Sequence, residues 1–211
     1  MKKQRIISLL LTFAMVFSLL PANAMAVKVE TFNDVSKDDW YYKYVDFVAD
    51  NEYFVGTSNT TFSPEMSMTR AMFVVVMAAM EGVKVDNNVA PFADVPAGTW
   101  YTDAVIWARD NGITTGVTAT EFAPGNPIAR EQMVAFLARY YALQGVEITG
   151  GDLSGYRDAD RINAYAEAAF GWAVQNGIVQ GVTADTLVPH GTANRAQIAT
   201  ILMRCCLTFG K

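Results

Sequence analysis

The chain has 211 residues and an acidic balance, with 16 lysines and arginines against 21 aspartates and glutamates and a formal net charge of −5. Such a balance argues against nucleic acid and against non-specific binding to anionic lipid. The only cysteines, Cys205 and Cys206, are adjacent, so the sequence lacks the spaced pairs of a disulfide framework.

Residues 1–26 have the pattern of a secretory signal peptide. MKKQR is a basic start, IISLLLTFAMVFSLL is an apolar run too short to span a bilayer comfortably, and PANAMA offers cleavage after Ala24 or Ala26. An uncleaved membrane anchor is the alternative. We expect a secreted chain with no membrane span after cleavage. Loss of the three basic residues of the leader brings the net charge near −8.

A unit of sequence occurs three times after this leader. Seven positions of the first copy recur 60 residues later in the second copy: Asp34, Trp40, Asn51, Gly56, Phe62, Pro64 and Arg70. Four of them recur a further 65 residues on, as Asn176, Gly181, Pro189 and Arg195, with Asp158 one residue out of step. This fixed spacing predicts three structural repeats, at 30–84, 90–145 and 154–210.

Each repeat reads as a helix, a structured loop and a second helix. The first helix ends at Asn-Gly, or at Asn51-Glu52 in the first copy, and the loop ends in F-x-P or its equivalent. The second helix carries apolar residues at helical spacing, as in Phe73, Val76, Met77 and Met80. One such helix cannot bury its apolar face alone. We therefore predict a mainly all-α fold, a pseudo-threefold spindle around a central three-helix bundle.

An arginine stands at the first position of each second helix, where the helix dipole disfavours a cation by roughly 0.3–1 kcal/mol. Free N–H groups and a guanidinium together make an anion-binding corner, and a charge-assisted bond to a carboxylate contributes about 1.5–3 kcal/mol. An incoming anion would therefore explain the arginines. The alternative is an internal ion pair with an aspartate of the repeats. The residues concerned are Arg70, Arg130 and Arg195, and Asp34, Asp94 and Asp158.

Aromatic residues recur near the start of each first helix. Trp40, Trp100 and their third equivalent, Tyr165, are either core anchors or platforms on which a sugar ring stacks. Glycines in the loops supply permissive backbone: Gly56, Gly116 and Gly181. Thr69 and Asn194 have the chemistry of helix N-caps, whereas Ala129 has lost it.

These ordered motifs resemble the S-layer homology domain: F-x-D-V, a Trp six residues after the Asp, the Asn-Gly helix end, the Gly-containing loop, F-x-P and a T-R-A-E-like helix start. The resemblance implies non-covalent binding of secondary cell-wall polysaccharide, often bearing pyruvylated N-acetylmannosamine, in grooves between repeats. It also implies that the arginines of the T-R-A-E-like motif contact this ligand. The motif's Glu is replaced by Met72, Gln132 and Gln197. The third copy lacks the Trp, so we expect its groove to be the weakest.

The leading hypothesis is a noncatalytic, secreted cell-wall anchoring module that needs no cofactor and no metal. The alternative is an S-layer lattice or adaptor protein that acts through protein–protein contacts. The chain has a single histidine, His190, and no nucleophile elbow or zinc-ligand spacing, which argues against a hydrolase. The candidate carbohydrate-binding residues are Arg70, Arg130, Arg195, Thr69, Asp34, Asp94, Asp158, Trp40, Trp100, Gly56, Gly116 and Gly181.

Overall fold

The computed structural model describes residues 28–83 and 92–210, so the predicted leader, residues 1–26, lies outside the described residues. Within these ranges the chain forms α-helices and short 3-10 helices and no strand, which confirms the mainly all-α prediction. The elements are η1 (Val29–Thr31), α1 (Tyr42–Asp50), α2 (Arg70–Glu81), α3 (Thr102–Asp110), α4 (Arg130–Leu143), η2 (Ala159–Arg161), α5 (Ala164–Gln175) and α6 (Arg195–Phe209).

The second helix of each repeat begins at the predicted residue. The Thr69 hydroxyl accepts a hydrogen bond from the Met72 N–H at 3.2 Å. At the start of α6, Asn194 and Gln197 each accept from the backbone N–H of the other, at 2.9 and 3.2 Å. This reciprocal pair is a capping box, and it satisfies N–H groups that the helix itself leaves without partners.

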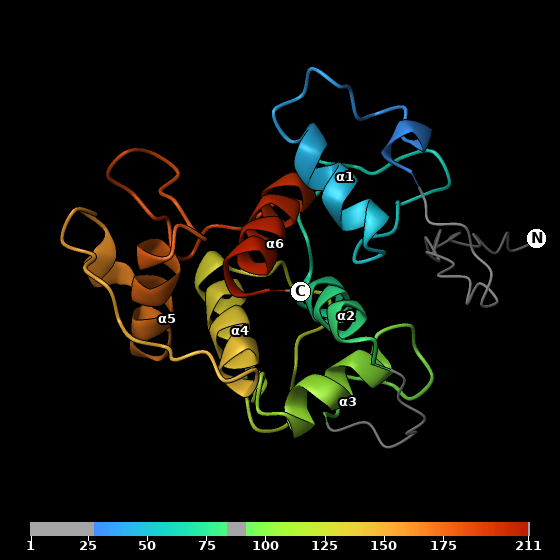
Figure 1. Ribbon diagram of the computed structural model, residues 1–211. Coiled ribbons are helices and arrows are strands. Elements are labelled where there is room, and N and C mark those ends of the chain that lie inside the picture. The colour runs from blue at the N-terminus through green and yellow to red at the C-terminus, as the bar shows by residue number, and fades with distance from the viewer. Residues whose placement is uncertain (1–27, 84–91, 211) are drawn as a thin grey trace, which may run out of the picture.

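The three second helices, α2, α4 and α6, occupy the centre of the molecule, and α1, α3 and α5 lie outside them (Figure 1). Each central helix packs against the first helix of the following repeat: α2 on α3, α4 on α5, and α6 back on α1. Large side chains fill the centre, where the Phe73 and Phe136 rings of α2 and α4 lie 6.4 Å apart. The repeats therefore share one core, and the third repeat closes on the first.

The segments that lead into the central helices are joined in the same cyclic order. Isolated antiparallel bridges connect Thr69 to Pro127, Ala129 to Thr192 and, across the ends of the chain, Asn194 to Ser67. Each bridge pairs a helix cap with the residue two positions before the cap of the next repeat. The three caps thus form a closed ring at one end of the spindle.

Truncation of Phe73 tests the shared core. Its side chain is fully buried, so Phe73→Ala should lower the free energy of unfolding by about 3–5 kcal/mol. Leu207→Ala is the control, because Leu207 on α6 is 70% exposed and its truncation should change stability by no more than about 0.5 kcal/mol. Denaturant unfolding followed by circular dichroism measures both, and equal effects would contradict the packing described.

Candidate functional site

The arginine at the start of each central helix is buried and reaches into the next repeat. Arg70, Arg130 and Arg195 are only 2–5% exposed. Their Nε atoms donate to backbone oxygens of the following loop: Arg70 to Phe122 at 2.8 Å, Arg130 to Leu187 at 2.8 Å and Arg195 to Phe62 at 2.7 Å. The side chains that looked misplaced in the first turn therefore link neighbouring repeats.

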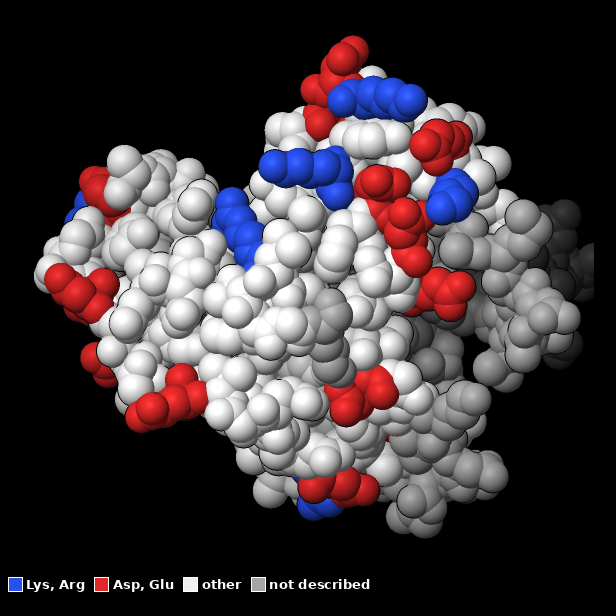
Figure 2. Space-filling view, in the orientation of Figure 1, with Lys and Arg blue, Asp and Glu red and all other residues white. Residues whose placement is uncertain are grey.

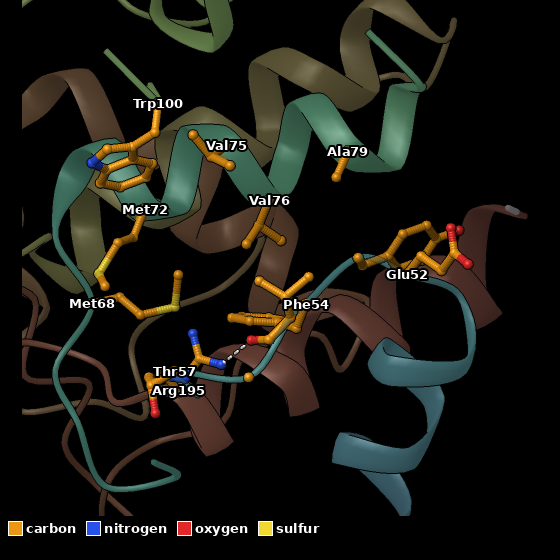
Figure 3. A pocket seen from close by; sticks show the side chains of 13 residues that line it. Glu52, Phe54, Thr57, Met68, Met72, Val75, Val76, Ala79, Trp100 and Arg195 are labelled. Carbon is orange, nitrogen blue, oxygen red and sulfur yellow. Dashed lines mark hydrogen bonds between the residues drawn. The ribbon is translucent and has the colours of Figure 1, made fainter. Parts of the chain in front are cut away.

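Two of these guanidinium groups bind a second carbonyl of the same loop. The Nη2 atom of Arg195 donates to the Val55 oxygen at 2.7 Å, and Figure 3 shows this bond. The Nη2 atom of Arg130 donates to the Gln180 oxygen at 3.2 Å. In the first repeat, Nη2 of Arg70 is buried and has no hydrogen-bond partner within the described part of the chain.

Aromatic rings cover the guanidinium groups of the first and third repeats. Arg195 lies over Phe62, 4.4 Å from the ring centroid, and Arg70 lies over Phe122 at 4.7 Å. Burial lowers the pKa of Arg70 and Arg195 to about 10. Both groups therefore remain charged at neutral pH, and carbonyl bonds with cation–π contacts offset the loss of hydration.

The aspartates of the repeats hold the same loops from within their own repeat. Both carboxylate oxygens of Asp34 accept backbone N–H bonds, from Phe62 at 2.8 Å and from Ser63 at 2.7 Å. Asp94 binds residues 122 and 123, and Asp158 binds residues 187 and 188, at 2.7–2.9 Å. Among the described residues no ion pair joins these aspartates to the three arginines.

One peptide group in each loop is consequently bound at both ends. The carbonyl of Phe62 accepts from Arg195, while the N–H of Ser63, in the same peptide group, donates to Asp34. Ser63 adopts φ +58°, as do the equivalent residues Ala123 (φ +58°) and Val188 (φ +52°). Such left-handed conformations are costly for residues other than glycine, so the two charged groups fix a strained turn.

The first two N–H groups of each central helix are also occupied. Arg70 N–H donates to the Asn126 oxygen at 2.9 Å and Ala71 N–H to the Pro124 oxygen at 3.1 Å, and the equivalent bonds occur in the other repeats. The expectation of free helix-start N–H groups is therefore wrong at these positions. Any ligand at this place must therefore be bound by exposed side-chain groups beside the helix start.

Grooves lie beside the arginines. The first groove is lined by residues 52–57 of the first repeat, by Met72 and Val76 of α2, by Trp100 of the second repeat and by Arg195 of the third (Figure 3). The third groove has the equivalent lining: residues 179–182, Gln197 and Ile201 of α6, Trp40 and Arg130. All three repeats therefore contribute to each groove.

The aromatic residue of a groove comes from the repeat that follows the loop. Trp40 is 59% exposed, so most of its area is not buried as a core anchor, whereas Trp100 is 37% exposed and keeps most of its area buried. The missing tryptophan of the third copy is therefore no loss to the third groove, whose tryptophan is Trp40 of the first repeat. The equivalent residue in the third copy is Tyr165. The Tyr165 hydroxyl donates to Glu131 at 2.8 Å. Burial, and then this hydrogen bond, raise the pKa of Tyr165 above its usual value, and the charges of Arg70 and Arg139 offset only part of the rise.

The loop glycines allow the backbone to fold tightly at the groove wall. A Cβ on Gly56 would lie 2.4 Å from the Ser58 oxygen, and one on Gly181 closer still to the Thr183 oxygen. The same close approach occurs at Gly116. Any side chain at these positions would displace the loop that the arginine binds. Thr69, for its part, caps α2 and lies beside the first groove without lining it.

Sequence reasoning missed several groove residues. Arg204 lines the third groove together with Gln180 and Thr200. Arg139 is its equivalent in α4, at the same 65-residue offset that relates the repeats. His190 is half exposed, and its Nε2 atom lies 3.6 Å from a carboxylate oxygen of the buried Glu131.

The family model described as S-layer homology domain matches residues 31–72, 91–134 and 155–199. The chain belongs to this family. It is 32% identical over 203 residues to an endoglucanase of Bacillus sp. (strain KSM-635), which covers 93% of this chain and 21% of that protein. It is 30% identical to the surface-layer 125 kDa protein of Lysinibacillus sphaericus, over 92% of this chain and 16% of that one.

The S-layer protein sap of Bacillus anthracis is 26% identical, over 88% of this chain and 22% of its own length. The chain thus spans about a fifth of the curated relatives it matches. Family and relatives together assign it as a cell-wall anchoring module, associated with the wall or the S-layer, and the matched repeats are noncatalytic. None of the helices in residues 28–83 and 92–210 has the length and hydropathy to cross a membrane.

The link between repeats can be tested by Arg195→Lys. A lysine cannot bind both the Phe62 and Val55 oxygens and keep its contact with the rings, so the free energy of unfolding should fall by about 1–3 kcal/mol. Arg109→Lys, at an exposed position on α3, should leave stability unchanged. Denaturant unfolding compares the two variants, and an unchanged Arg195→Lys would contradict this structural role.

Acid should weaken the aspartate contacts. Burial by itself raises the pKa of Asp158, but the N–H bonds from Leu187 and Val188 outweigh it and hold the pKa below its usual value of 3.8. A lowered pKa means that the ionised group stabilises the fold above the unfolded-state pKa, and that this contribution disappears as the pH falls through the folded-state pKa.

Asp158→Asn should therefore lower Tm at pH 7. As the pH falls from about 5 to about 2, the Tm of the variant should fall less than the Tm of the parent, so the difference between the two proteins narrows. Thermal melts at intervals of pH measure the difference between the two proteins. A difference in Tm that stays constant across this range would show that Asp158 does not contribute through its ionised form.

Proposed function

We propose that this module binds an anionic secondary cell-wall polysaccharide in the grooves between its repeats. The acidic group we propose is a carboxylate carried by the sugar, such as the pyruvate ketal of pyruvylated N-acetylmannosamine. The observation that carries the proposal is the composition of the third groove. There Arg130 and the exposed Trp40 line one opening, and none of the described residues that line it is acidic.

The chemistry of the groove suits an acidic sugar. A guanidinium has five N–H donors, and Arg130 uses Nε and one Nη2 bond on the loop, so donors remain for a carboxylate oxygen. The exposed face of Trp40 offers a surface against which a sugar ring can stack. The two arginines in the lining of this groove favour an anion at this place although the chain as a whole is acidic. On the face seen in Figure 2, basic side chains lie near α1 and α6, and acidic side chains lie among them around α1.

The recurring residues then divide into two roles. Arg130 and Arg195 bind the loop with part of the guanidinium group and line a groove as well. We expect the same of Arg70, which binds the Phe122 oxygen. Asp34, Asp94 and Asp158 fix the turn, and the glycines keep the loop close to the helix. Several weak grooves on one rigid body gain avidity on a repetitive polymer, because the second contact becomes intramolecular. We propose that residues 1–26 direct export to the wall.

Co-sedimentation with purified wall sacculi tests the function. We expect the protein to sediment with native walls and to remain in solution with walls from which ketal-linked pyruvate has been removed by mild acid. Equal binding to both preparations would overturn the proposed carboxylate. Ordered self-assembly without glycan, seen by analytical ultracentrifugation, together with no binding to walls, would favour the lattice or adaptor role.

A variant of the exposed ring separates binding from folding. Trp40→Ala should weaken wall binding roughly fivefold, equivalent to about 1 kcal/mol, and lower Tm only by the loss of the ring contacts with Tyr41 and Tyr44. Leu207→Ala removes a comparable exposed apolar side chain from α6 and should bind walls as the parent does. Variants of Arg70 or Arg130 are less informative, because these residues also hold the repeats together.

A further inference from the structure

The first and third grooves share one construction but differ at one position of the central helix. This position is Ala79 in α2, Arg139 in α4 and Arg204 in α6, and the residues are related by the same 60- and 65-residue offsets as the rest of the repeat. Ala79 lines the first groove and Arg204 the third. Because the position faces the groove, its side chain changes what the groove can bind.

The third groove contains two guanidinium groups. Arg204 is fixed there, since Nη1 donates to the Ile178 oxygen at 3.3 Å and Nη2 approaches the Gln180 side-chain oxygen at 3.4 Å. Arg130 also lines this groove. The other lining residues in the described part of the chain are uncharged, so none of them neutralises the pair. Two cations that share one groove repel each other, and a carboxylate between them removes this repulsion.

The first groove has a different character. Its lining includes Met68, Met72 and Val75, with Ala79 in place of the second arginine (Figure 3). The one cation, Arg195, donates two bonds to its loop, and Glu52 contributes an opposing charge at the rim. A carboxylate that entered this groove would lose its hydration and gain little hydrogen bonding or electrostatic attraction in return.

The second repeat carries the counterpart of Arg204. Arg139 donates from Nη1 to the Ile113 oxygen at 3.0 Å, as Arg204 does to the Ile178 oxygen. The Tyr165 hydroxyl, at the position of the tryptophans, donates to the buried carboxylate of Glu131 at 2.8 Å. A negative charge at this place offsets part of the attraction for an anion.

We infer that Arg204 is the residue that makes the third groove the principal site for the acidic sugar. Arg139 is its counterpart in the second repeat, where we expect a weaker site of the same kind, and Ala79 leaves the first groove unable to take a carboxylate. This inference rests on the proposed function. It adds a ranking of the grooves and a specificity-determining residue outside the recurring helix-start motif.

Calorimetric titration with soluble wall-glycan fragments tests the ranking. The probes are pyruvylated fragments and the same fragments after removal of pyruvate, and the measured quantity is the ratio of the two affinities. Arg204→Ala should reduce this ratio at least tenfold, and Arg139→Ala by a smaller factor. Ala79→Arg, at an exposed position, should raise the number of pyruvylated fragments bound per chain.

Two variants control for structure and for net charge. Arg204→Lys keeps the charge and should retain most of the ratio, whereas a purely structural loss would lower affinity for both fragments alike. Arg109→Ala changes the net charge equally on an exposed part of α3 and should leave the ratio unchanged. If the parent discriminates between the fragments and Arg204→Ala does so equally well, the ranking is overturned while the proposed function stands. If the parent binds neither fragment, both are overturned.

Discussion

The structure depends on a peptide group held between a carboxylate and a guanidinium. In each loop, the N–H is bound by an aspartate of the same repeat and the carbonyl by an arginine of the preceding one. The third repeat binds the first in this way, so the links form a closed ring. Each of these charged groups is buried or half-buried, and charge-assisted hydrogen bonds are most effective in such surroundings. The two groups bind opposite ends of the same peptide, so each strengthens the polarity of that peptide for the other. Removing either partner would release a turn that includes a left-handed non-glycine residue.

The grooves follow from this ring. The arginine that fixes a loop stands at its edge, and the next repeat places an aromatic ring on the opposite side. Binding and folding therefore use the same guanidinium groups, and loss of wall binding in an arginine variant does not by itself identify a ligand contact. Groove positions that do not hold the ring together, such as Trp40 and Arg204, allow the two roles to be measured separately.

Much of the fold was predictable from local chemistry. The threefold offset, the caps at Thr69 and Asn194, the Asn-Gly helix ends and the apolar faces of the central helices indicate the elements and the spindle. Both explanations of the arginines assumed a carboxylate partner, whereas the described partners are backbone carbonyls. No side-chain pattern marks a carbonyl as an acceptor, because every residue carries one.

The sequence by itself determined the repeat, the helices and the family, since these depend on periodicity and capping within a few tens of residues. Only the tertiary structure decided which repeat supplies each part of a groove. Arg195 reaches residue 62 and Trp40 faces α6 because the third repeat closes on the first, and contacts so distant along the chain leave no local signal. The physical reason is cyclic packing: each apolar helix buries its face against the following repeat, and this choice of neighbour brings together residues from all three repeats.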